Sequence, residues 1–312
     1  MKSDSTKEII KKIDEKCNSL GLDKINHLEG LLHTKPITYW DYIQLNSLLG
    51  LQIQKTNYKD EMVFIVYHQI NELIFKMILW ELQQVAEETI LKVSFFEEKL
   101  MRISRYFDML TSSFIIMQEG MDVAQYNKFR HALAPGSGFQ SAQYRKIEFA
   151  STELINLIDP RYRKTIDRDT PFEHALEHLY WQAAGKDYKT NNKSILLTSF
   201  ESEYKEEFIT FMKVYNTKNL WSRFKDLPSL KRKNKSLIKA MRHYDYTVNI
   251  KWVKGHYNAA KHYISSNSNN EIEGTGGSNW QKYMHPKYQK RIFFPELWSS
   301  KEKDNWGHEV EN

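Results

Sequence analysis

Residues that break regular structure are scarce in this chain. Its 312 residues include only 12 glycines and 7 prolines, so few positions favour a turn or end a helix. Between them, apolar residues recur at steps of three and four, the period of a helix with one buried face. This spacing predicts helices from the N-cap Asp60 to residue 90 and over 95–118, 122–134, 141–158, 171–184, 194–215, 236–245 and 247–265. With no strand alternation and no internal repeat, the sequence predicts an all-α fold, a helical bundle with long core helices and small helical insertions.

The length permits one large domain with a sizeable core. Apolar residues make up 41% of the chain, which is typical of a globular protein. We therefore expect a single helical domain over residues 1–312, with a helical insertion at 190–245.

The charge balance argues against a nucleic-acid partner. There are 45 basic and 39 acidic residues, a net charge of +6 that is spread along the chain. The densest basic run, KRKNK at 231–235, has no glycine-rich phosphate loop or nucleic-acid motif near it. We interpret it as a solvated loop between helices.

The sequence also predicts no membrane partner and a cytoplasmic location. The N-terminus is polar, without an apolar core of signal-peptide length. The most apolar stretch, 62–82, is interrupted by polar and charged side chains. Cys17 is the single cysteine, so no intrachain disulfide can form, and a reducing compartment is the default.

His68 lies within that apolar stretch, in VYHQINELIFKMILWEL at 66–82. On a helix it shares a stripe with Phe64, Asn71 and Phe75. A histidine between two phenylalanines suits the wall of a pocket for an aromatic ligand. It suits an ordinary core position equally well, and spacing does not separate the two.

His256 lies in NIKWVKGHYNAAKHYI at 249–264. A helical projection places it on an inward stripe with Val253, Ala260 and Tyr263, beside small residues that leave room for something flat. A neutral imidazole on a rigid helix is a common ligand of haem iron. Spacing alone favours the alternative, a core histidine hydrogen-bonded to a carbonyl.

A third grouping is His174 and His178, which at i, i+4 share a helical face, as two zinc ligands often do. No third ligand is evident. The pair therefore leaves a divalent-metal protein as a minor alternative.

Tyr126 and Arg130 also share a face, in AQYNKFRHALAPGSGF at 124–139. An arginine near a glycine-containing turn can hold a carboxylate through two hydrogen bonds, and the nearby aromatic ring can cover the ligand. A surface arginine in a weak ion pair is the usual alternative. A second glycine cluster, EGTGGS at 273–278, suggests either close approach to a ligand or an ordinary turn.

In combination, four stretches resemble the tryptophan 2,3-dioxygenase family over about residues 29 to 298. They are FIVYHQINELIFKMILWEL, FRHALAPGSGFQSAQYRKIEF, the helical segment with His256, and GTGGS, in the family's order. The resemblance implies haem b, ferrous in the active state, as cofactor. It implies L-tryptophan and O2 as substrates and N-formyl-L-kynurenine, with both oxygen atoms inserted at the indole C2–C3 bond, as product.

The resemblance also implies roles for individual residues. His256 matches the haem iron ligand, and His68 the catalytic-site histidine that faces the indole N–H. The matched substrate-binding positions are Phe64 at the indole, Tyr126, Arg130 at the carboxylate, Leu133, and Thr275 at the amino-acid end. Ser137 and Gly138 match positions at the haem edge. Tyr39 and Tyr42 belong to an N-terminal segment, 1–45, that in the family packs on a neighbouring subunit of a homotetramer.

Two other haem-based functions remain open at this stage, beside the divalent-metal alternative. A haem-dependent monooxygenase acting on a substituted indole or tryptophan analogue would use the same residues. A non-catalytic haem-binding protein would need no recognition of an amino acid, and Arg130 and Thr275 argue against it.

Overall fold

The computed structural model describes residues 2–132, 140–187, 192–265 and 284–308. By its internal contacts the chain divides into two compact units, Met1–Gln52 and Ile53–Asn312. The sequence predicts one domain with an N-terminal segment ending at residue 45. The packing of that segment on a neighbouring subunit stays a prediction.

The N-terminal unit consists of four helices. They are α1 (Lys2–Ser19), α2 (Lys24–His33), α3 (Tyr39–Tyr42) and α4 (Leu45–Leu49). Asp23 caps α2 by accepting a hydrogen bond from the backbone N–H of Asn26, and α2 packs on α1. Most apolar side chains of this unit are exposed.

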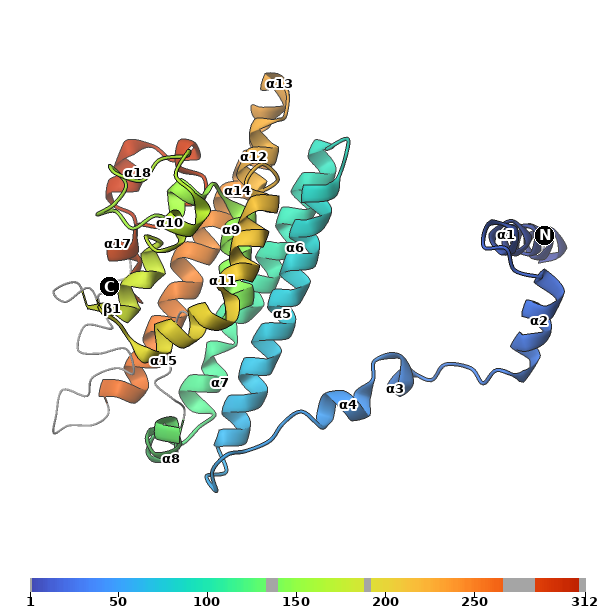
Figure 1. Ribbon diagram of the computed structural model, residues 1–312, viewed down its shortest axis with the longest axis horizontal. Coiled ribbons are helices and arrows are strands. Elements are labelled where there is room, and N and C mark those ends of the chain that lie inside the picture. Colours follow the sequence, from blue (N-terminus) through green and yellow to red (C-terminus); the bar gives the residue numbers. More distant parts are fainter. Residues whose placement is uncertain (1, 133–139, 188–191, 266–283, 309–312) are drawn as a thin grey trace. The chain divides into compact units, whose positions relative to one another are not determined.

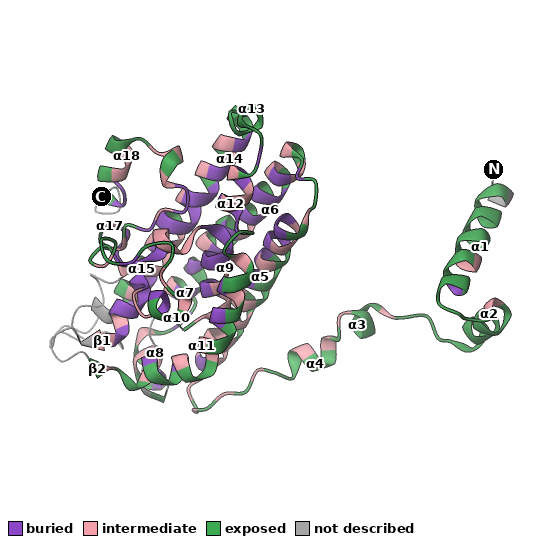
Figure 2. Cartoon of the chain, turned by 45° about the horizontal axis from the view of Figure 1, so that its top comes forward, coloured by how far each residue is buried: buried purple, intermediate pink, exposed green. Residues whose placement is uncertain are grey.

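The second unit is built around four helices that pack against one another. They are α5 (Glu61–Glu87), α6 (Val93–Ser112), α9 (Ala142–Ser151) and α14 (Lys235–Tyr246). α5 contacts α6 and α9, and α14 lies along α6 (Figure 1). Ile74, Ile78, Leu82 and Val85 of α5 recur at three- and four-residue steps, and all are buried. Figure 2, in which buried residues are purple, shows them mainly along these packed helices.

α14 is the first part of a longer helical rod. A π-helical turn, η4 (Thr247–Lys251), leads directly into α15 (Trp252–Ser265). α15 packs on α6, on α7 (Phe114–Glu119) and on α8 (Val123–Phe129), and α8 runs into the 3-10 turn η1 (Arg130–Ala132). These are the elements that position the site described below.

The remaining elements cover the bundle. They are η2 (Leu154–Leu157), α10 (Phe172–Leu176), η3 (Tyr180–Gly185), β1 (Lys186–Asp187), β2 (Asn192–Lys193), α11 (Ile195–Tyr215), α12 (Leu220–Lys225), α13 (Ser229–Arg232), α17 (Pro286–Gln289), η5 (Pro295–Leu297) and α18 (Ser300–Asp304). Strands β1 and β2 pair antiparallel, with Lys186 opposite Lys193, and they are the only strands in the described part of the chain. The prediction of an all-α fold is therefore confirmed.

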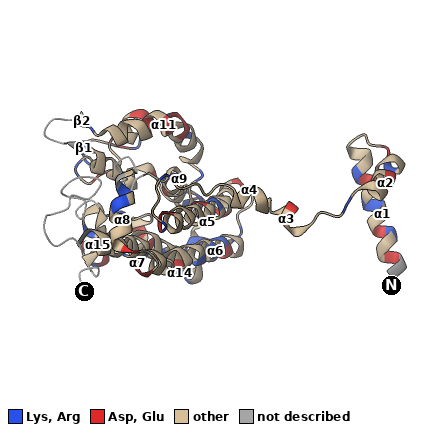
Figure 3. Ribbon diagram, turned by 90° about the horizontal axis from the view of Figure 1, so that it is seen from below, with Lys and Arg blue, Asp and Glu red and all other residues tan. Residues whose placement is uncertain are grey.

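Within the predicted insertion at 190–245, α11 packs on α9 and α14 on α6, so this range contributes to the core. Acidic and basic residues are mixed along the helices (Figure 3).

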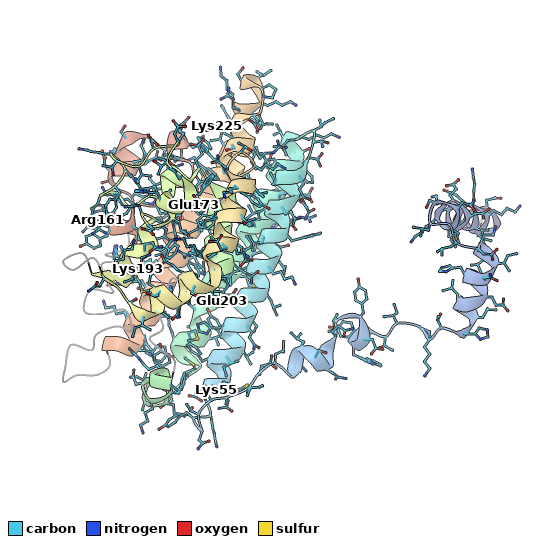
Figure 4. The ribbon with its side chains drawn as sticks, in the orientation of Figure 1. Lys55, Arg161, Glu173, Lys193, Glu203 and Lys225 are labelled. Carbon is cyan, nitrogen blue, oxygen red and sulfur yellow. The ribbon has the colours of Figure 1, made fainter. Side chains whose placement is uncertain are left out.

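The N-terminus of α5 differs from the sequence expectation. Asp60 occupies the N-cap position, but its side chain makes no capping hydrogen bond. It accepts instead from the backbone N–H of Asp122, 2.6 Å away at the start of α8. Glu61 accepts from the backbone N–H groups of Lys55 and Thr56, and so ties the preceding segment to the helix. Figure 4 labels Lys55 at this end of α5.

α5 is long and apolar enough, by length and composition alone, to cross a membrane. The core helix of a soluble protein passes the same test. One face of α5 packs on α6 and α9, and the sequence prediction of no membrane partner stays a prediction.

Candidate active site

His68 lies on α5, one turn after Phe64. The two ring centroids are 4.0 Å apart, and His68 Nδ1 is 2.7 Å from the backbone carbonyl oxygen of Phe64. Because a carbonyl oxygen only accepts, Nδ1 carries the proton in this hydrogen bond. In the neutral ring, Nε2 is then a hydrogen-bond acceptor.

The surroundings of His68 keep its ring neutral. Burial among protein atoms lowers its pKa below 6.5, against the opposing effects of the Phe64 carbonyl and the charge of Glu72. By accessible surface, however, the side chain is exposed. Both observations hold if protein surrounds most of the ring while one side is open, as suits a group that meets a ligand.

His256 lies on α15 between two aromatic rings. Phe114 of α7 stacks on it with centroids 5.8 Å apart and an interplanar angle of 11°, and the Trp252 centroid is 5.6 Å away. Burial lowers the pKa of His256 to about 4, and repulsion from His68 acts in the same direction whenever that ring is protonated. The imidazole is therefore neutral at pH 7. Ring contacts link the two histidines, which come from different helices: the Tyr67 centroid is 5.6 Å from that of His68 and 6.4 Å from that of Phe114, which stacks on His256.

Gly255 allows α7 to approach α15 at this point. A Cβ atom at position 255 would lie 2.5 Å from Cδ2 of Phe114. Real Cβ atoms essentially never come so close to another heavy atom, so a side chain here would displace the ring that stacks on His256.

An aromatic cluster extends from Phe64 towards α8. The Phe64 centroid is 5.7 Å from that of Phe129 and 6.1 Å from that of Tyr126. The Tyr126 centroid is in turn 4.3 Å from that of Tyr263 on α15. Tyr126 therefore contacts both the helix of His68 and the helix of His256 through aromatic rings.

Arg130 adds a buried positive charge to this cluster. Its side chain is 5% exposed, and its guanidinium carbon lies 5.9 Å from the ring centroid of Tyr126. Its Nε atom is buried and has no hydrogen-bond partner among the described residues. A buried guanidinium without full pairing is costly, so this position suits an anionic ligand group.

The structure describes some of the other predicted site residues. Tyr39 and Tyr42 lie on α3 in the N-terminal unit, where they are exposed. Leu133, Ser137, Gly138 and Thr275 lie outside the described residues.

The His174 and His178 rings are stacked, with centroids 4.7 Å apart, and His178 Nδ1 is 2.9 Å from the backbone oxygen of His174. Among the described residues, no group of three or more His, Cys, Asp or Glu side chains could hold a metal ion. The divalent-metal alternative therefore gains no support from the described part of the chain.

Sequence reasoning missed Trp252 and Phe114, the two rings against His256. Trp252 precedes His256 by four residues, so helical spacing could have identified it. Phe114 comes from a different helix, and no local pattern points to it.

Fold and site together define an all-α protein whose candidate active site joins two neutral histidines and a buried arginine through aromatic rings. The comparisons with known proteins agree with this class. The model of the family described as tryptophan 2,3-dioxygenase matches residues 29–209.

Relatives extend the match beyond that range. The tryptophan 2,3-dioxygenase of Bacillus thuringiensis (strain Al Hakam) is 30% identical over 296 residues, covering 88% of this chain and 97% of the relative. That of Ruegeria sp. (strain TM1040) is 44% identical over 115 residues, covering 36% of this chain and 40% of the relative. That of Exiguobacterium sibiricum is 28% identical over 283 residues, covering 86% and 93%. The chain belongs to the tryptophan 2,3-dioxygenase family, a family of enzymes.

Proposed function

We propose that this protein is a cytoplasmic, haem-dependent dioxygenase. It inserts both atoms of O2 into the indole C2–C3 bond of L-tryptophan and releases N-formyl-L-kynurenine. The observation that carries the proposal is that ring contacts through Tyr67 and Phe114 link His68 and His256, which come from different helices, in one aromatic site with the buried Arg130.

The residues around His256 fit a haem. Its imidazole is neutral, and within the described part of the chain no group hydrogen-bonds to its ring, so a ring nitrogen is available to iron. Flat apolar rings, Phe114 and Trp252, flank it. In this proposal His256 holds the iron, with Ser137 and Gly138 at the haem edge. When bound, the haem supplies the iron at which O2 reacts.

The protein's own side chains orient the substrate. Arg130 binds the carboxylate, because its buried Nε has no hydrogen-bond partner within the described part of the chain. Phe64 and Tyr126 pack against the apolar part of the substrate, together with Leu133, and Thr275 binds the amino-acid end. His68 Nδ1 donates to the Phe64 carbonyl, which leaves Nε2 as an acceptor. Nε2 accepts a hydrogen bond from the indole N–H. His68 thus fixes which edge of the indole faces the cofactor.

We also propose that the active form is a homotetramer. Val66, Ile70, Leu73, Met77 and Trp80 form a stripe on α5 at alternating four- and three-residue steps; we call it the α5 stripe. Its side chains are 36%, 39%, 47%, 46% and 62% exposed. This is the spacing with which one helix packs along another, and we assign the stripe to a second copy of the chain. The exposed Tyr39 and Tyr42 of the N-terminal segment are the residues we expect near a neighbouring subunit's site.

The test is product analysis after reaction under ¹⁸O2. The haem-loaded protein is reduced anaerobically and mixed with L-tryptophan and labelled oxygen, and the product is identified by mass spectrometry. We expect N-formylkynurenine with two labelled oxygens. A product with one labelled oxygen would show a monooxygenase. Bound haem with no product in the wild type would indicate a non-catalytic haem protein.

A further inference from the structure

The helical rod that carries His256 contains an irregular turn. The π-helical turn η4 (Thr247–Lys251) lies between α14 and α15, and four of its five residues are buried. A π turn takes one more residue per turn than an α-helix. Every side chain after it is therefore rotated by about one residue, roughly 100°, from its place on an uninterrupted helix. The direction that His256 faces depends on this turn.

Side chains on both sides of Asn249 hold the turn. Asn249 is 1% exposed, and its Nδ2 donates to Oδ1 of Asp245, 2.6 Å away. Its Oδ1 accepts a hydrogen bond from Nε of Arg291. Asp245 also accepts from the backbone N–H groups of Phe293 and Phe294, at 2.9 and 3.0 Å. Asn249 thus ties the π turn to the C-terminal segment.

Arg291 is itself fixed by α9 and η3. It is 2% exposed, pairs with Glu148, and donates to the hydroxyl oxygens of Tyr144, 2.8 Å away, and Tyr180. Glu148 is completely buried and pairs with Arg145 as well, at 3.0 Å. A buried charged network of this kind holds one geometry, because displacing any member leaves a desolvated charge unpaired.

The same network touches the residue that lies beside His256. The Tyr144 ring stacks on Trp252, with centroids 4.6 Å apart and an interplanar angle of 24°, and Trp252 contacts His256. The π turn is therefore held at Asn249, and the first residue of α15 is held by Tyr144.

We propose that Asn249 is a positioning residue, which together with Asp245 and Arg291 keeps the π turn and so directs His256 towards the site shared with His68. Without this clamp the rod relaxes to a continuous α-helix, and His256 rotates away. The inference rests on the proposed function in one respect, the assignment of His256 as the haem ligand.

The experiment titrates haemin into three cofactor-free variants and records the Soret band and the electron paramagnetic resonance spectrum of the ferric iron. Asn249→Ala removes the clamp and keeps the extra residue. Asn219→Ala is the matched control, since Asn219 is also a 1% exposed, hydrogen-bonded asparagine, at the N-cap of α12. Deletion of Asn249 removes both the clamp and the extra residue. A continuous α-helix then directs His256 as in the wild type.

We expect Asn249→Ala to bind haemin 10- to 100-fold more weakly, the range for residues that orient a metal ligand, and to lose the signature of histidine ligation. Asn219→Ala should keep the wild-type spectrum even where its melting temperature falls. The deletion variant should regain the signature. Far-UV circular dichroism checks folding, and Asn249→Ser replaces Asn249→Ala if the latter does not fold.

A wild-type spectrum and affinity in Asn249→Ala would overturn the inference, as would a deletion variant that folds but fails to regain the signature. His256→Ala separates this failure from that of the proposed function. If His256→Ala keeps the histidine signature, the ligand assignment itself is wrong. If His256→Ala loses the histidine signature while Asn249→Ala keeps it, His256 is the haem ligand and Asn249 is not a positioning residue.

Discussion

At the scale of single residues, the site depends on desolvation. Burial lowers the pKa values of His68 and His256, and the buried Nε of Arg130 has no partner in the ranges that the structure describes. Neutral imidazoles can accept a hydrogen bond or bind iron, and a desolvated guanidinium binds a carboxylate more strongly than an exposed one does. The same residue types fully surrounded by water would do neither well.

Replacing Arg130 by alanine tests the carboxylate assignment. Losing a charge-assisted contact costs about 1.5–3 kcal/mol, so KM for L-tryptophan should rise roughly 10- to 150-fold. Steady-state kinetics measure this, with Arg232→Ala on the exposed α13 as the control. An unchanged KM in Arg130→Ala would remove this residue from the substrate site.

The histidines also predict how the stability of the cofactor-free protein varies with pH. Below about pH 6.5 both rings take up protons in the unfolded chain, whereas the folded state keeps them neutral, His256 down to about pH 4. The unfolded state then binds more protons than the folded state does. The contribution of the two neutral rings to the free energy of unfolding is therefore complete above pH 6.5 and is lost as pH falls towards 4. Urea unfolding of wild type and His68→Gln at pH 5 and 7 measures it. The variant should lose less stability on acidification, and an equal loss in both would contradict the prediction.

At the scale of elements, the close approach of α7 and α15 shapes the surroundings of His256. Phe114 can stack on the imidazole because Gly255 leaves its ring room. Helix propensity would favour alanine over glycine here by about 1 kcal/mol. Overpacking a core position costs about 1–3 kcal/mol, and the 2.5 Å contact makes steric strain the larger effect.

Gly255→Ala should therefore lower the melting temperature and weaken haemin binding. Gly30→Ala is a matched control on α2, because a Cβ there has no neighbour within 4 Å. The control should be neutral or slightly stabilising. If Gly255→Ala is as stable as the wild type and binds haemin with the same affinity, the Phe114 ring moves aside without a loss of stability.

At the scale of the whole molecule, apolar side chains are left uncovered. The α5 stripe lies on the same helix as His68, on side chains that the described chain leaves exposed. A contiguous exposed apolar surface is characteristic of an interface between proteins. Association of copies through the stripe would place the interface on the helix that carries the site.

Leu73→Glu combined with Trp80→Glu should therefore reduce the proposed homotetramer to a smaller species, because carboxylates in an apolar interface are costly. Light scattering coupled to gel filtration measures the mass. Leu230→Glu is the control, at an 82% exposed leucine on α13. If the double variant keeps the wild-type mass, the α5 stripe is not the interface.

The sequence predicted which segments are helical better than it predicted the residues at which the helices begin and end. The range 171–184 has helical spacing, yet α10 ends at Leu176. Leu179 pairs instead with Ile158 in an isolated bridge, and the carbonyl of His178 accepts from the N–H of Asp159. Likewise, Asp60 hydrogen-bonds to α8 rather than capping α5. Local spacing carries no information about such distant partners.

By itself the sequence determined the all-α class, the helical stripes that hold His68 and His256, and the family resemblance. Periodicity and motifs are local properties, so a linear sequence contains them. Only the tertiary structure decided which rings surround each histidine and which way His256 faces. Phe114 reaches His256 from another helix, and Arg291 holds the π turn through Asn249, 42 residues away in sequence. These arrangements depend on packing between distant segments, which no local pattern records.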